Sequence, residues 1–198
     1  MRRRFKFSFV MILLGVFVLV GIVPLALNYS SLSAEKKVAT GMDNARFIEQ
    51  IAPDVQKLST YYGIRPSIVI AQAAHDSHFG QSLLAAKYHN LFAVLAKPGE
   101  DSIRLKNTER HEGNIKEIKR NYAVYPSWDY ALERYLEGLR DGSLAHKDLY
   151  NLLATASSVS VAAQAFYRYD YTQDDDYANQ LERIIKEYNL EKYDQNQN

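Results

Sequence analysis

The chain has 198 residues, 47% of them hydrophobic and 24% charged, a composition that excludes wholesale disorder and favours one folded domain over a multidomain enzyme. It contains no Cys, which excludes disulfides, thiolate nucleophiles and Cys-ligated metal sites. The first 34 residues hold four cations and no acid, so the remainder carries 20 cations against 23 acids and is a poor candidate for a nucleic-acid partner.

The amino terminus predicts a membrane anchor. Residues 1–6 are basic, and residues 7–27 contain no charge. About 20 apolar residues are enough to cross a bilayer core of ~30 Å. The preceding cations should stay in the cytoplasm, which predicts a single-pass cell-membrane protein with its domain on the extracellular face. A cleaved signal peptide is the alternative, for which Leu32-Ser33-Ala34 is a weak cleavage site.

Residues 28–42 are polar and without a period, and predict a linker before a folded domain over residues 43–194 and a polar tail over 195–198. Apolar residues recur at helical steps over residues 47–62, and Gly63 should end that helix. Pro66 suits the first turn of a second helix. Its body, residues 68–74, is nearly all apolar and should be central and buried.

A β-hairpin is expected between Pro98 and Pro126. Residues 102–106 alternate like a strand, Gly113-Asn114 is a turn signal, and residues 123–125 close a second extended arm. Helices should return after Ser127, over 147–154 and 158–169, and from Tyr177 to Tyr188. The chain is therefore expected to form a mostly helical α+β domain with one inserted hairpin.

An acidic pair is the first candidate for chemistry. Asp76 ends an apolar helix and Glu109 lies on the hairpin. A carboxyl group shielded from water keeps its proton more readily and can donate it to a leaving oxygen. A second carboxylate would complete a glycosidase pair. The alternative is that Asp76 merely ends its helix and Glu109 is a solvated surface charge.

Aromatic residues are the second candidate, because the sequence has 15 Tyr residues, which cluster around Trp128 and between residues 166 and 177. Aromatic faces pack on sugar rings, so these clusters fit a carbohydrate groove. Core packing is the alternative, particularly for Trp128 and Tyr177. His75, Asp76 and His78 also share one segment, but an H-x-x-H pattern without a dedicated third ligand is weak, and we expect no metal and no cofactor.

Several segments resemble glycoside hydrolase family 73, the bacterial peptidoglycan N-acetylglucosaminidases found in many autolysins. They are Phe47–Pro53, Tyr62–Ser67, Ala71–Ser82, Asn90-Leu91-Phe92, Tyr125–Trp128, Tyr171–Ala178, Tyr188–Leu190 and Tyr193-Asp194. The resemblance implies a lysozyme-like fold with a substrate groove between a helical body and the hairpin lobe. It also implies hydrolysis of the glycan strand after N-acetylglucosamine, without a metal.

The resemblance assigns three catalytic positions. The helix-end acid of the family falls on Asp76, the hairpin acid on Glu109 with Glu112 as the fallback, and the functional tyrosine on Tyr171. Substrate-binding candidates are Gln72, Asn90, Phe92 and Tyr177. Glycan strands are the expected partner, the membrane is contacted through the anchor, and protein partners are left open.

Three departures from the family pattern stand out. Asp76 replaces the usual Glu and is one methylene shorter, a displacement of about 1.5 Å, which can lower a rate about 100-fold. Ala93 replaces a usual Gly, and Phe79 a usual Trp. We therefore keep two alternatives open: a catalytically weak or inactive glycan-binding protein, and a muramidase or lytic transglycosylase on a similar fold.

Overall fold

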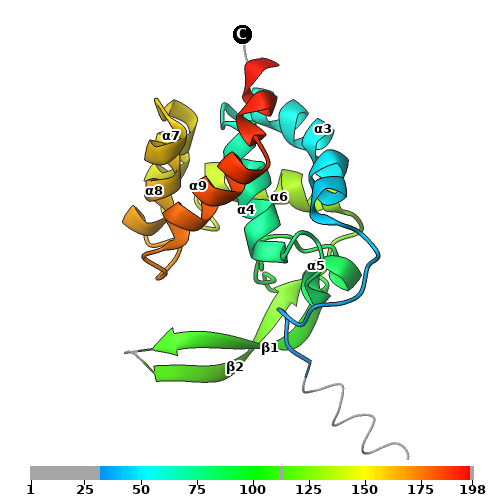
Figure 1. Ribbon diagram of the computed structural model, residues 1–198. Helices are drawn as coiled ribbons and strands as arrows, with labels where there is room; N and C mark the ends of the chain where they lie inside the picture. The colour runs from blue at the N-terminus through cyan, green and yellow to red at the C-terminus, as the bar shows by residue number, and fades with distance from the viewer. Residues whose placement is uncertain (1–31, 112–113, 197–198) are drawn as a thin grey trace, which may run out of the picture. The chain divides into compact units, whose positions relative to one another are not determined.

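The computed structural model describes residues 32–111 and 114–196 (Figure 1). It divides into two compact units. The larger unit comprises residues 34–103 and 121–198, and the smaller one combines residues 104–120 with the segment that ends at Ser33. The anchor predicted over residues 7–27 lies outside the described residues. Within the described ranges, no helix combines the length and apolarity needed to span a membrane.

Helices dominate the larger unit. In chain order they are α3 (Asn44–Tyr62), α4 (Pro66–Ser77), α5 (Leu83–Tyr88), α6 (Trp128–Asp141), α7 (Lys147–Thr155), α8 (Val159–Arg168), α9 (Tyr177–Glu187) and the 3-10 helix η2 (Leu190–Asn196). The smaller unit contains most of a two-stranded sheet, β1 (Ser102–His111) and β2 (Asn114–Ala123). The mostly helical α+β fold with one hairpin is confirmed.

Local signals set the bounds of α3. The side chain of Asp43 accepts a hydrogen bond from the backbone of Arg46 at 2.8 Å and so caps the first turn. Pro53 lies inside the helix without ending it. Gly63 ends it in the left-handed conformation, with φ 72°, which glycine adopts without a steric penalty.

Helix α4 lies at the centre of the larger unit, packed against α3, α9 and η2 (Figure 1). Every residue from Pro66 to Ala74 is buried, as the apolar run predicted. Arg65 precedes the first turn without capping it. The cap comes instead from Asp194, which accepts hydrogen bonds from the backbone and hydroxyl of Ser67, both at 2.8 Å.

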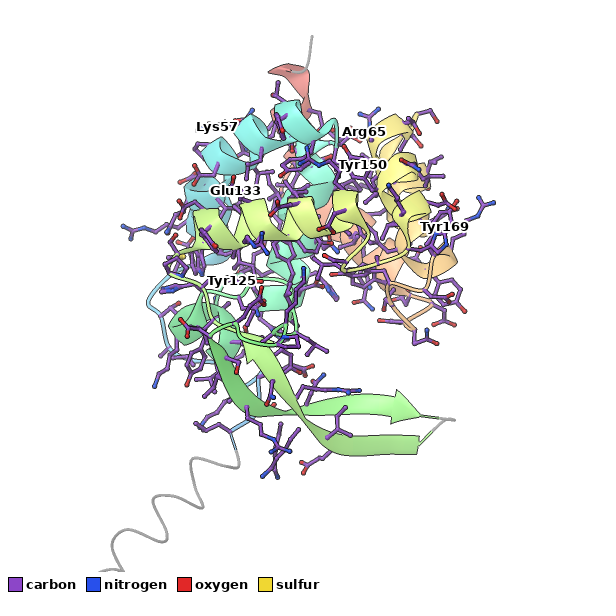
Figure 2. The ribbon with its side chains drawn as sticks, turned by 180° about the vertical axis from the view of Figure 1, so that it is seen from behind. Lys57, Arg65, Tyr125, Glu133, Tyr150 and Tyr169 are labelled. Carbon is purple, nitrogen blue, oxygen red and sulfur yellow. The ribbon has the colours of Figure 1, made fainter. Side chains whose placement is uncertain are left out.

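Helix α7 and the residues just after it are hydrogen-bonded to the turn between α3 and α4 (Figure 2). The hydroxyl of Tyr150 donates to the carbonyl of Tyr62 at 3.0 Å, and the guanidinium of Arg65 donates to the carbonyl of Ser157 at 3.2 Å. Both acceptors lie at the end of a helix or just beyond it, where backbone carbonyls lack intrahelical partners. These contacts hold the two ends of the α3–α4 turn.

The segment before α3 is bonded to the body. Leu83 and Leu84 donate their backbone N–H groups to the carbonyls of Lys36 and Ala34, and Val38 donates to the carbonyl of Gln81. Residues 34–38 of the predicted linker therefore belong to the folded unit. These hydrogen bonds join backbone groups and use no side chain, so a polar sequence without a hydrophobic period does not predict them.

Two short elements differ from the sequence expectations. Helix α5 has only six residues, too few for a hydrophobic period, and it is capped by Ser82. Helix η2 extends to Asn196, so the first residues of the predicted tail are part of a 3-10 helix. The two strands agree with the hairpin predicted around residues 113–114, whose turn lies outside the described residues.

Candidate active site

Asp76 occupies the last turn of α4, with its side chain 14% exposed. The helix ends immediately afterwards, because His78 takes the left-handed conformation with φ 51°. Ser77 fixes this exit: its hydroxyl donates to the carbonyl of Ala73 and accepts from the backbone of Gly80 at 2.7 Å. A buried helix and a tightly bonded turn thus place one carboxylate at a defined point near the surface.

Two side chains hold the Oδ1 atom of Asp76. The hydroxyl of Tyr177, the first residue of α9, donates to Oδ1 at 2.9 Å. Nδ1 of His75 lies 2.9 Å from the same oxygen. No hydrogen bond to Oδ2 is found among the described residues. A carboxyl group oriented in this way suits proton donation to a leaving group.

Aromatic rings surround this carboxylate. Tyr177 is 4% exposed, and its ring centroid lies 5.8 Å from Phe166 and 6.5 Å from Tyr171. Tyr171 also packs against Tyr135 at 6.4 Å. Tyr177 is a core residue, as the packing alternative expected, and its hydroxyl also contacts Asp76; its contact with a sugar stays a prediction. Tyr171 is half-buried and lies in the same cluster.

Burial keeps these phenols neutral. It is the main cause that raises the pKa of Tyr177, Tyr171 and Tyr135, and the negative charge of Asp76 raises all three further. Each hydroxyl therefore keeps its proton at any physiological pH. Tyr171 and Tyr177 can donate hydrogen bonds to a carboxylate or a sugar but cannot act as general bases there.

Gln72 lies one helical turn before Asp76 on the same face of α4. Gln72 is 1% exposed, and hydrogen bonding by its side chain lowers the pKa of Tyr171 and of Tyr177. Gln72 therefore belongs to the buried polar cluster behind Asp76. The substrate-binding role predicted for it stays a prediction.

Asn90 and Phe92 occupy buried positions. The amide nitrogen of Asn90 donates to the carbonyls of Val94 and Ala123, both at 2.9 Å, and its oxygen accepts from the backbone of Val94. Phe92 stacks on Tyr135 with ring centroids 3.8 Å apart. The structure thus gives Asn90 a loop-holding role and Phe92 a packing role. Their contact with a sugar stays a prediction.

The predicted hairpin acid cannot be placed beside Asp76. Glu109 lies in β1, and its side chain is outside the described residues, as is Glu112. The second-acid assignment therefore stays a prediction. Among the described residues, no His, Asp and Glu side chains are grouped as ligands for a metal ion, and His75 and Asp76 bond to each other instead.

Sequence reasoning missed Gln180, and it considered His75 only as a metal ligand. Nε2 of His75 contacts Oε1 of Gln180 in α9. Gln180 and Tyr177 are three residues apart on one helix, so their common face was available as a signal. No local pattern indicated that this face packs against the end of α4.

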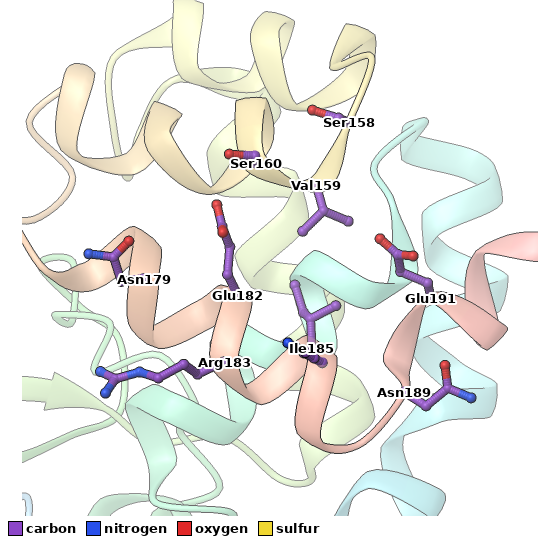
Figure 3. Close-up of a pocket in the computed structure, with 10 residues that line it drawn as sticks. Ser158, Val159, Ser160, Asn179, Glu182, Arg183, Ile185, Asn189 and Glu191 are labelled. Carbon is purple, nitrogen blue, oxygen red and sulfur yellow. The ribbon is translucent and has the colours of Figure 1, made fainter.

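A cavity of about 660 Å³ lies between α8, α9 and η2 (Figure 3). Its lining includes Ser158, Asn179, Glu182, Arg183, Ile185 and Glu191. Charges of both signs line it, and neither Asp76 nor any tyrosine does. We therefore place the candidate active site at Asp76 and not in this cavity.

The family model described as mannosyl-glycoprotein endo-beta-N-acetylglucosaminidase matches residues 52–190, and the chain belongs to this glucosaminidase family of glycoside hydrolases. It is 29% identical to the exo-glucosaminidase LytG of Bacillus subtilis over 93% of this chain and 67% of LytG. It is also 29% identical to the peptidoglycan hydrolase FlgJ of Escherichia coli, over 73% of this chain but only 47% of FlgJ.

A solved structure agrees with this assignment. The catalytic domain of the autolysin Auto from Listeria monocytogenes superposes with a TM-score of 0.68 at 30% identity. The match covers 79% of this chain and 91% of that domain. The resemblance to family 73 is thus confirmed, and the chain is a glycoside hydrolase.

Proposed function

We propose that this chain is a membrane-anchored peptidoglycan hydrolase that cleaves the β-1,4 bond after N-acetylglucosamine and acts in cell-wall remodelling. The observation that carries the proposal is a carboxyl group at the end of a buried helix, oriented by Tyr177 at 2.9 Å, within a glucosaminidase match over residues 52–190. The name of FlgJ, a peptidoglycan hydrolase, supplies the substrate class, and that of LytG, an exo-glucosaminidase, supplies the sugar.

In the proposed mechanism, Asp76 is the general acid. Tyr177 and His75 hold Oδ1, and Oδ2 delivers a proton to the glycosidic oxygen as the bond breaks. Glu109 supplies the second carboxylate, which activates water or stabilises the oxocarbenium-like transition state. The separation between the two carboxyl groups decides between inversion and retention of the anomeric configuration.

Two further groups contribute to the proposed substrate site. Gln72 acts through its hydrogen bonding to Tyr171 and Tyr177 and so positions their hydroxyls for a sugar. The neutral hydroxyl of Tyr171 orients the acetamido group or stabilises the charge that develops at the anomeric carbon. Both lie near Asp76, because Gln72 precedes it by one helical turn and the charge of Asp76 acts on Tyr171.

The test is to incubate the full chain with purified peptidoglycan and identify new chain ends by mass spectrometry. Reducing N-acetylglucosamine is expected. Asp76→Asn should abolish turnover while leaving folding and glycan binding intact, because the amide keeps the shape but has no carboxyl proton. Unchanged turnover in this variant would refute Asp76 as the acid.

Asp76→Glu tests the departure from the family. Retained or increased activity would mean that the site accommodates the longer acid, and lost activity that it has been rebuilt around Asp. Glycan binding without new ends in the native chain would favour the inactive binding protein. That outcome would contradict the proposed hydrolase.

A muramidase is the second candidate, because a probable N-acetylmuramidase of Lactococcus lactis is 31% identical to this chain over 150 residues. The chain spans only 34% of that relative. Reducing muramic acid ends would identify this activity, and anhydro-muramic ends a lytic transglycosylase. Either would replace the proposed bond specificity.

The proposal includes attachment to the outer face of the membrane through residues 7–27. Ala34 is already hydrogen-bonded to Leu84 of the body, so only residues 28–33 separate the predicted anchor from the domain. Six extended residues reach at most ~22 Å, which restricts the enzyme to glycan near the bilayer. Protease added to wall-stripped cells should digest the domain, and a soluble chain starting near Glu35 would refute the anchor.

A further inference from the structure

His75 sits between the predicted acid and α9, and its two ring nitrogens have different neighbours. Nδ1 lies 2.9 Å from Oδ1 of Asp76, and Nε2 contacts Oε1 of Gln180. The side chain is 28% exposed, and its ring packs edge-on against Tyr177 with centroids 4.9 Å apart. The imidazole is therefore held on three sides.

The orientation of Gln180 is fixed from its other end. Its Nε2 donates to a carboxylate oxygen of Asp174 at 3.0 Å and to one of Asp176 at 3.3 Å. Oε1 must then be the atom that faces His75, and a carbonyl oxygen can only accept a hydrogen bond. Nε2 of His75 consequently carries a proton.

The Asp76 side of the ring leads to the same requirement. Oδ1 already accepts a hydrogen bond from Tyr177, and with the proton of the proposed acid on Oδ2, Oδ1 is an acceptor for Nδ1 as well. Both contacts of His75 are satisfied together only when both nitrogens carry protons, which is the imidazolium form. A neutral ring has one N–H group and must lose one of the two hydrogen bonds.

The charges around the ring favour this form. Burial lowers the pKa of His75, but the hydrogen bond and charge of Asp76, then Gln180 and Asp174, outweigh burial and raise it above 6.5. Arg183 of α9 pairs at 3.1 Å with Asp176, an acceptor of Gln180, and His78, at the end of the same helix as His75, is a cation-forming neighbour of the ring. The pKa of His78 is itself lowered, by burial first and then by Lys37.

We propose that His75 is a positioning residue whose imidazolium form holds Oδ1 of Asp76 and leaves the carboxyl proton on Oδ2, so that hydrolysis slows as rising pH removes protons from the coupled pair. This inference rests on the proposed function. Because the pKa of His75 is raised in the folded state, the two hydrogen bonds of its imidazolium form are complete at low pH and are lost as the pH rises through that pKa. The family resemblance assigned no role to this position.

The test compares the pH dependence of kcat on purified peptidoglycan for the full chain and its variants. In His75→Asn, the amide nitrogen replaces Nδ1 as a donor to Asp76 but does not titrate. Its alkaline limb should move to higher pH by about one unit, since the limb belongs to the coupled pair. His75→Leu should lose about 10-fold in kcat below the alkaline limb, because Oδ1 keeps its hydrogen bond from Tyr177 but loses the one from His75.

His146→Asn is the matched control, because Asn can replace His146 as the N-cap of α7, and this 66% exposed side chain contacts Asp148 and Tyr169, away from Asp76. Its pH profile should follow the native chain. An unchanged alkaline limb in His75→Asn, or native activity in His75→Leu, would overturn the proposal.

A second measurement separates this inference from the hydrolase assignment. In the NMR titration of the full chain, the pKa of His75 should fall by about one unit in Asp76→Asn, because the carboxylate that stabilises the imidazolium is gone. This readout needs no turnover. If the native chain cuts no glycan but the pKa of His75 falls in Asp76→Asn, the proposed function is wrong and the pairing of His75 with Asp76 stands. If the pKa of His75 does not change in this variant, the pairing is refuted.

Discussion

Asp194 caps α4 from the far end of the chain, and its replacement by Ala should destabilise the whole domain. Its Oδ1 and Oδ2 atoms accept from the backbone and hydroxyl of Ser67, both at 2.8 Å. Arg65 contributes a guanidinium nitrogen 3.6 Å from Oδ2. The Asp194 side chain is 12% exposed and Ser67 is fully buried, so water cannot readily replace these bonds.

The magnitude follows from these contacts. Loss of a capping acceptor costs about 1–2 kcal/mol. The buried Ser67 hydroxyl, left without its acceptor, adds about 1–3 kcal/mol. The one-third-exposed Arg65 contributes less than about 1 kcal/mol, because solvent screens its pair. We expect a loss of about 3 kcal/mol, which for a domain of roughly 150 residues lowers Tm by about 9 °C.

The assay is thermal unfolding of the full chain, followed by circular dichroism. Glu191→Ala is the matched control, because it removes an exposed acid from the same 3-10 helix and should change stability by less than about 0.5 kcal/mol. Asp194→Asn keeps one acceptor oxygen, so its Tm should lie between those of Asp194→Ala and Glu191→Ala. If Asp194→Ala melts together with the Glu191 control, the capping argument is wrong.

Three further predictions concern the site and its loops. Tyr177→Phe removes a donor to Asp76 and should lower kcat about 10-fold without unfolding the chain; native kcat would refute its orienting role. Tyr171→Phe and Glu109→Gln should each lower kcat with little change in KM if they act in the transition state, whereas a raised KM would assign a binding role. Ala93→Gly should raise the free energy of unfolding by about 0.5–1 kcal/mol, because Ala93 holds φ 51°; urea unfolding that shows no gain would contradict this.

The sequence by itself determined the local elements. Gly63 and Pro66 marked helix bounds, and apolar periodicity placed the main helices and the two strands. Each of these signals acts within about four residues, where backbone conformation and hydrogen bonding are set by near neighbours. The position of Asp76 at the end of an apolar helix, and with it the candidate acid, could be read in the same way.

Only the tertiary structure decided what surrounds that acid. Tyr177 reaches Asp76 from 101 positions along the chain, and Asp194 reaches Ser67 from 127. Gln180 gained its place beside His75 only when α9 packed on α4. The physical reason is that a local pattern states which face of a helix is buried but not which other helix covers it. That choice depends on the packing of the whole core at once, and it is this packing that converts a helix-end carboxylate into an oriented acid.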